Sequence, residues 1–168
     1  MSKLTFTASS LPVSKKLHKL LSEQFTAHLL INEALTASSL PVSKKLHKLL
    51  SEQFTAHLLI NEALTTSHYL VFNFRDKTYS ADEGGFHPVE MAICQTSAGA
   101  WSIEYITDFA YMGNYYPELE RNLDFDFRAG QFFVAYRGWL PMQGSRDAKE
   151  LYRLWENNFL AYVDMDSY

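Results

Sequence analysis

The stretch WSIEYITDFAYM, residues Trp101–Met112, decides the fold of this chain. Its apolar and polar side chains follow the period of two that is typical of a β-strand, and we expect a bend near Asp108. Outward from this strand, the same period predicts further strands in four segments: His68–Phe74, Val89–Gln95, Leu123–Phe127 and Gln131–Arg137.

Turns and loops, with no helical segment between them, connect these predicted strands. Gly84-Gly85 marks a turn or loop, Thr96–Gly99 is expected to form a hairpin turn, and Gly113–Tyr116 a loop. Consecutive strands joined in this way pair in antiparallel fashion. The sequence therefore predicts an antiparallel sheet of about four or five strands over residues 67–140.

The segment after the sheet changes to a helical period. Residues 145–163 are expected to form a helix, with Ser145 as the N-cap and Asp147 complementing the positive helix N-terminus. One apolar stripe is predicted on this helix, formed by Leu151, Leu154, Trp155, Phe159 and Tyr162.

The segment before the sheet consists of the same 29 residues twice. TASSLPVSKKLHKLLSEQFTAHLLINEAL occupies residues 7–35 and again residues 36–64, without one difference. Each copy has a helical apolar period, with His28 or His57 expected to be buried within it. In the first copy the stripe comprises Leu17, Leu20, Leu21, Phe25, Ile31 and Leu35, with Lys15, Lys19, Glu23, Thr26 and Glu33 opposite.

Two identical helices do not make a solenoid, because repeat folds need three or more units that diverge. The identity points to a recent or artificial duplication. It is either an insertion without new function or a spare helix that docks on another chain. We expect the second copy, which is closer to the sheet, to occupy the native helix position. Helices at the ends with strands between them predict an α+β fold, as a single domain over residues 1–168.

Composition and charge limit the classes of function. Of the 168 residues 47% are hydrophobic, which indicates a globular chain. The net charge is −4, and because each repeat copy contributes +1 the remainder carries −6. That argues against nucleic acid as a partner. The single cysteine, Cys94, fits a reducing compartment. With no signal-peptide core and no apolar run of membrane-spanning length, we expect a cytoplasmic protein without a membrane partner.

Four polar residues lie close together in the segment DEGGFHPVE: Asp82, Glu83, His87 and Glu90. Carboxylates and imidazole can bind a divalent metal or perform acid–base chemistry. Their spacing matches no metal-ligand signature, so we predict no metal and no cofactor. If the segment is extended, His87 and Glu90 point apart. The alternative interpretation is a polar turn.

Two further sets are candidates for binding. Asp124 and Asp126 share one face of a predicted strand and, with Asp108, form an acidic set that could contact a basic partner. Tyrosine, tryptophan and arginine are enriched at interface hot spots. The second set is therefore a candidate recognition surface, or else part of the core: Tyr111, Tyr115, Tyr116, Arg137 and Trp139, with Phe132, Phe133 and Tyr136 nearby.

Four segments together resemble a bacterial family known as domain of unknown function 2787. They are NFRDKTYSADEGGFHPVEM, WSIEYITDFAY, LDFDF and LYRLWENNFLAY, and the resemblance covers roughly Leu40–Tyr162. It implies a strongly twisted antiparallel sheet flanked by N- and C-terminal helices, similar to the mitochondrial matrix acidic protein that binds the globular heads of complement. It also implies a tendency to oligomerise, and it supplies no catalytic residues. The duplicated helix departs from the family pattern.

We therefore expect a non-enzymatic protein-interaction or oligomerisation module, which forms a homo-oligomer and binds an unidentified protein partner. The alternative is a metal-dependent or acid–base enzyme that uses Asp82, Glu83, His87 and Glu90. Binding of single-stranded nucleic acid by the aromatic residues is the weakest hypothesis, because the chain is acidic.

Overall fold

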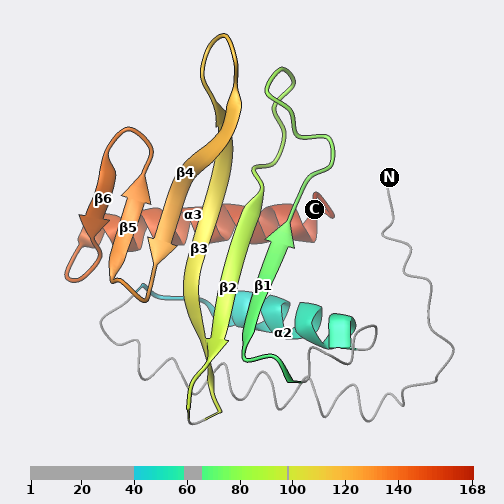
Figure 1. Ribbon diagram of the computed structural model, residues 1–168, viewed down its shortest axis with the longest axis vertical. Helices are drawn as coiled ribbons and strands as arrows, with labels where there is room; N and C mark the ends of the chain where they lie inside the picture. The colour runs from blue at the N-terminus through green and yellow to red at the C-terminus, as the bar shows by residue number, and fades with distance from the viewer. Residues whose placement is uncertain (1–39, 59–65, 98) are drawn as a thin grey trace, which may run out of the picture.

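The computed structural model describes residues 40–58, 66–97 and 99–168. In these residues an N-terminal helix precedes a run of consecutive strands, and a second helix follows them, which confirms the α+β class (Figure 1). The elements are α2 (Lys44–Leu58), β1 (Tyr69–Phe74), β2 (Val89–Gln95), β3 (Trp101–Met112), β4 (Glu118–Asp126), β5 (Gln131–Val134), β6 (Gly138–Pro141) and α3 (Arg146–Asp164).

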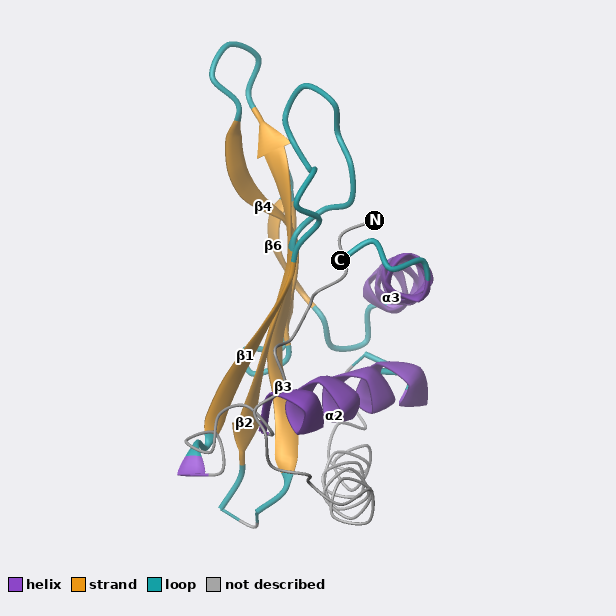
Figure 2. Cartoon of the chain, turned by 90° about the vertical axis from the view of Figure 1, so that its right-hand side faces the viewer, coloured by secondary structure: helices purple, strands orange, loops and turns teal. Residues whose placement is uncertain are grey.

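The six strands form one antiparallel sheet in the order of the sequence, β1-β2-β3-β4-β5-β6. Figure 2 shows α2 and α3 on the same side of this sheet. Because side chains alternate between the faces, one row of paired residues across all six strands faces the helices: Phe72, Met91, Ile106, Phe125, Phe132 and Leu140.

The neighbouring row points away from the helices, and we call this side of the sheet the open face. Its central row consists of Asn73, Glu90, Thr107, Asp124, Phe133 and Trp139. No helix or strand of the described residues lies over it (Figure 2). The sheet thus has one apolar face that forms the core and one face of mixed polarity.

The helices complete the core with aromatic and leucine side chains. Leu46 and Leu50 of α2 are fully buried. On α3, the rings of Trp155 and Phe159 stack with their planes 8° apart, and Tyr152 meets Phe125 of the sheet edge to face. The buried Glu156 carboxylate accepts hydrogen bonds from the Ser43 backbone at 3.0 Å and from the Tyr152 hydroxyl at 2.7 Å. This carboxylate therefore ties the start of α2 to α3.

The predicted strand count was too low because one hairpin was missed. The predicted run Gln131–Arg137 holds β5 and the turn after it, and the chain then reverses between Val134 and Gly138 into β6, a strand that was not predicted. At this turn Tyr136 and Gly138 have φ angles of 65° and 79°. In addition, β4 begins at Glu118, ahead of the predicted Leu123. The predicted start of β2 at Val89 is confirmed, and so is the bend near Asp108, where the β3–β4 register shifts.

The boundaries of α3 were predicted better than the faces of either helix. Ser145 is the N-cap of α3, and its side chain accepts a hydrogen bond from the Ala148 backbone. However, Leu154 is 62% exposed, because Tyr152 and Glu156 take the side of α3 that faces the core. On α2, Thr55 is fully buried although its counterpart was placed on the polar side. The Thr55 hydroxyl donates to the Ser51 carbonyl, so its burial leaves no polar atom unpaired.

The histidine prediction for the repeat was wrong in its second copy. His57 is exposed, and its ring nitrogen lies 2.7 Å from the Gln53 carbonyl. The first copy, including His28, lies outside the described residues, so the fold described has one N-terminal helix where tandem copies were predicted. Neither described helix is long and apolar enough to cross a membrane.

The duplication makes an unusual stability test possible. Leu46→Ala empties a fully buried position and would ordinarily cost about 2–5 kcal/mol. The first copy, with Leu17 intact, can make identical contacts, and only the connection to β1 becomes roughly four times longer, which costs about 1 kcal/mol. We therefore expect Leu46→Ala alone to lower the free energy of unfolding by about 1 kcal/mol. The double variant Leu17→Ala/Leu46→Ala should lose the full amount.

Urea unfolding of the wild type, both single variants and the double variant measures these differences. Leu17→Ala alone should have little effect. If Leu46→Ala alone lowers the free energy of unfolding as much as the double variant does, the first copy does not take the place of the second.

Candidate functional site

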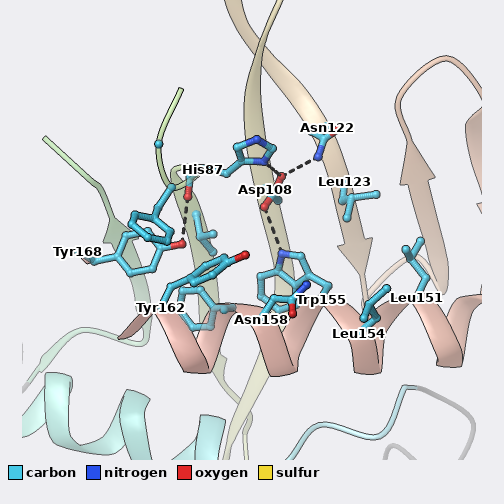
Figure 3. Close-up of a pocket in the computed structure, with 14 residues that line it drawn as sticks. His87, Asp108, Asn122, Leu123, Leu151, Leu154, Trp155, Asn158, Tyr162 and Tyr168 are labelled. Carbon is cyan, nitrogen blue, oxygen red and sulfur yellow. Dashed lines mark hydrogen bonds and ion pairs between the residues drawn. The ribbon is translucent and has the colours of Figure 1, made fainter. Parts of the chain in front are cut away.

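Asp108 of β3 is the polar centre of the helix-covered side of the sheet. It is 7% exposed, and its carboxylate accepts three hydrogen bonds from three different parts of the chain (Figure 3). His87 Nδ1 and Asn122 Nδ2 each lie 2.9 Å from Oδ1, and Trp155 Nε1 lies 3.2 Å from Oδ2. A buried carboxylate needs such partners, because losing its hydration is costly.

A β-bulge positions the amide that reaches Asp108. Asp108 pairs with Leu123, while the next residue of β3, Phe109, pairs with Arg121. Asn122 is therefore the extra residue of β4 at this point, and bulges redirect side chains in this way. The bulge places the Asn122 amide on the same side as Asp108.

The loop from Arg75 to Pro88 carries His87 and is held by Asp76. The Asp76 carboxylate accepts hydrogen bonds from the Thr78 hydroxyl and backbone and from the Phe86 backbone, and the bonds from Thr78 lower its pKa. Gly85 has a φ of +129°, and a Cβ there would lie 2.8 Å from Asp76 Oδ2. The second glycine of the EGG sequence is thus required for the loop that presents His87.

His87 is fixed from one side and open on the other. Because a carboxylate can only accept, Nδ1 carries the proton of the His87–Asp108 bond. This hydrogen bond raises the pKa of His87. The Tyr168 hydroxyl donates to the His87 carbonyl at 3.2 Å. The His87 side chain is 39% exposed, and no described residue bonds to Nε2.

A cavity of about 350 Å³ lies beside this group, between α3 and the sheet. Most of its wall is aromatic or aliphatic, and Figure 3 shows Asp108 and Asn122 on the strands and Asn158 on α3. The lining residues are Gly85, Phe86, His87, Val89, Asp108, Asn122, Leu123, Leu151, Leu154, Trp155, Asn158, Phe159, Tyr162 and Tyr168.

The four polar residues considered together in the sequence do not meet in space. Asp82 and Glu83 are exposed in the loop. His87 turns to Asp108 on the helix-covered side, whereas Glu90 accepts a hydrogen bond from the Tyr105 hydroxyl at 2.6 Å on the open face. His87 and Glu90 therefore face opposite sides of the sheet and cannot act on one ligand.

The acidic pair Asp124 and Asp126 lies on the open face. Asp124 is 4% exposed; its Oδ2 accepts from Thr107 Oγ1 and Arg121 Nε, at 2.9 and 3.1 Å. Its Oδ1 is buried without a hydrogen-bond partner among the described residues, and burial raises the pKa of this carboxyl. Asp126 Oδ1 accepts from the Ala129 backbone at 2.7 Å, closing the β4–β5 turn.

Arg121 connects this acidic pair to aromatic rings. Its guanidinium carbon lies 5.6 Å from the centre of the Phe133 ring and 5.1 Å from that of Trp139. These contacts, together with the ion pair from Arg121 Nε to Asp124, hold the arginine in place. Trp139 itself is 42% exposed.

The remaining predicted residues lie at the ends of hairpins. Tyr115 and Tyr116 are 92% and 88% exposed at the turn between β3 and β4, where that hairpin extends beyond the rest of the sheet (Figure 1). Tyr111 packs against Tyr79, with 5.2 Å between ring centres. Arg137 is exposed in the β5–β6 turn, away from this hairpin turn.

Of the polar residues that line the cavity, the sequence singled out His87 but did not connect it with Asp108, Asn122 or Asn158. Asp108 was grouped with Asp124 and Asp126, although it lies on the other side of the sheet. Counting by twos from Ile106 to Asp108 would have placed it on the apolar face, where a carboxylate is unusual. Trp155 was predicted only as part of the apolar stripe of its helix. No local sequence pattern marked Asn122, Asn158 or Tyr168.

Comparison with known proteins now identifies the family. The family model described as "protein of unknown function (DUF2787)" matches residues 44–168. The chain belongs to this family. No curated protein matches the chain.

Two solved structures from Vibrio cholerae are similar to it. One, a hypothetical protein from the VSP-II pathogenicity island, is 85% identical with a TM-score of 0.70, over 79% of this chain and 92% of that one. The other, a conserved hypothetical protein from pathogenicity island VPI-2, is 55% identical with a TM-score of 0.68, over 78% of this chain and 92% of that one. Its structure is described as sharing structural homology with the human P32 protein.

The His87–Asp108 hydrogen bond predicts a pH dependence. The pKa of His87 is raised above 6.5 in the folded chain, so the bond stabilises the fold fully below that pH and the stabilisation is lost as the pH rises through the raised value. An NMR titration of the imidazole should give a pKa above 6.5 in the wild type. In Asp108→Asn it should fall toward 6.5.

Urea unfolding across the same pH range provides an independent check. His87→Gln should flatten this part of the stability profile, while Glu83→Gln, at an exposed position of the same loop, should not. A wild-type pKa at or below 6.5 would contradict the assignment.

Proposed function

We propose that this protein is a non-enzymatic interaction module that associates with a second copy of itself through the open face. The carrying observation is that both described helices cover one side of a six-stranded sheet (Figure 2). The other side presents apolar side chains at both of its edges. Tyr69 and Val71 on β1 are 47% and 44% exposed, and Trp139 on β6 is 42% exposed.

The distribution of charge on this face favours a second copy. Arg121 lies over the Phe133 and Trp139 rings near the β6 edge, whereas Glu90 and Asp124 occupy the middle. A two-fold axis can place the arginine of each copy opposite the carboxylates of the other, because residues i and j exchange roles across such an interface. The same surface is thereby self-complementary.

The buried Asp124 carboxylate supports the same proposal. Its Oδ1 has no hydrogen-bond partner among the described residues, and buried polar atoms in native structures rarely remain unpaired. This oxygen has almost no exposed surface, so a donor from a second copy reaches it only once the side chains that cover it shift. The Arg121 guanidinium is already held against two rings, so little side-chain entropy is lost when it forms a contact across the interface.

Absolute mass by light scattering after size exclusion tests the proposal. The full chain, at 19.3 kDa per copy, should elute as a dimer or a larger assembly. Val71→Asp and Trp139→Asp put a charge into the proposed interface and should each weaken association by about 30-fold or more, as for an interface hot spot of about 2 kcal/mol. Met165→Asp, at a 60% exposed position of the helix-covered side, is the matched control.

A version lacking Ala8–Thr36 separates this interface from association through the spare repeat copy. The open-face proposal expects that version to keep the mass of the full chain. It is contradicted if the shortened version becomes a single copy, if the wild type is already a single copy, or if Met165→Asp dissociates as readily as Val71→Asp.

A further inference from the structure

The cavity beside His87 is separate from the open face, since α3 and the helix-covered side of the sheet form its walls. We propose that it binds a small aromatic monocarboxylate, with the carboxylate on His87 Nε2 and the ring against the aromatic wall. This is a binding site, in which no covalent bond is made or broken.

Folding leaves part of the hydrogen-bonding capacity beside Asp108 unused. Asp108 is already bonded to His87, Asn122 and Trp155, so its function is to hold these groups in place. The imidazole uses Nδ1 for Asp108, which leaves Nε2 as a directed donor whenever the ring is protonated. Asn158 adds a side-chain amide that no other described residue engages.

The shape and surface of the cavity suit an aromatic ring. The rings of Phe86 and Tyr162 lie 4.6 Å apart, and those of Phe86 and Tyr168 6.4 Å apart, which builds one wall. Trp155, on α3 like Tyr162, continues the aromatic lining and is fixed by its bond to Asp108. A volume of about 350 Å³ is at the small end for ligand sites, and it suits a single ring with a short side chain.

The charged residues in the lining of the cavity restrict the ligand further. His87 is the one lining residue that can become a cation, and no lysine or arginine lines the cavity. The Asp108 carboxylate also lines it, but both of its oxygens already accept hydrogen bonds, and it faces the Nδ1 side of the His87 ring, so the ligand carboxylate is placed on the Nε2 side. A phosphate dianion would lack partners there, whereas a single carboxylate matches one charge-assisted donor. A purely apolar ligand would leave the His87 donor without an acceptor, at the cost of its desolvation. The combination therefore selects a monoanion with an aromatic body.

The test uses phenylacetate, with three compounds that each lack one feature. Phenylacetamide keeps the shape but not the charge, acetate keeps the charge but not the ring, and inorganic phosphate is a larger anion without a ring. Titrations of the full chain by calorimetry or NMR at about pH 6 keep the histidine protonated. We expect phenylacetate to bind with a Kd of about 1 mM or tighter, phenylacetamide at least tenfold more weakly, and the others not measurably.

Variants then assign the contact. His87→Gln keeps a hydrogen-bond donor but removes the charge, so phenylacetate should lose about tenfold in affinity while phenylacetamide is unchanged. Asn158→Leu, at an exposed helix position, should weaken phenylacetate binding severalfold without harming the fold. His68→Gln, an exposed histidine outside the cavity, is the matched control and should bind like the wild type.

Three results would overturn the proposal. The first is that phenylacetate shows no binding at a concentration about ten times the expected Kd. The second is equal affinity for phenylacetate and phenylacetamide. The third is an effect of His68→Gln as large as that of His87→Gln. Each can be observed whatever the oligomeric state, so this test is independent of the proposed self-association.

Discussion

The arrangement of the β1–β2 loop, β4 and α3 depends on one buried carboxylate. Asp108 stands on the apolar side of β3, where an unpaired charge would be strongly destabilising. Its three donors come from the β1–β2 loop, from β4 and from α3. Each of these elements must therefore be in place before the cost of burying the charge is offset. The carboxylate makes a loop, a strand and a helix depend on one another.

A second buried carboxylate has the corresponding role at the other helix. Glu156 joins α3 to the beginning of α2 through Ser43, and Tyr152 completes its hydrogen bonding. The two carboxylates accompany the apolar row that crosses all six strands, Asp108 on the sheet and Glu156 on α3. The row supplies the favourable burial of nonpolar area, and the carboxylates determine where along the sheet each helix packs. Apolar packing alone specifies such positions less sharply.

The sequence predicted those features of the fold that depend on neighbouring residues. The period of two in Trp101–Met112 and the Ser145 cap are local signals, and both predictions are confirmed. The β5–β6 hairpin was missed because its turn relies on a positive φ at Tyr136, an uncommon choice for a tyrosine. The cavity could not be assembled at all, because His87, Asp108 and Trp155 are distant in sequence and become neighbours only through the β2–β3 pairing and the packing of α3 on the sheet.

The two candidate surfaces share β3 but differ in how completely their charges are satisfied. Thr107 and Asp108 are consecutive and point to opposite faces, so each belongs to a different carboxylate network. On the covered side, both oxygens of Asp108 are engaged, and the unused donor is the neighbouring imidazole. On the open face, Asp124 retains a buried oxygen without a described partner. On the covered side the unused group is thus a donor, whereas on the open face it is a buried acceptor, so the two faces of β3 differ in the hydrogen bonds that folding leaves unmade.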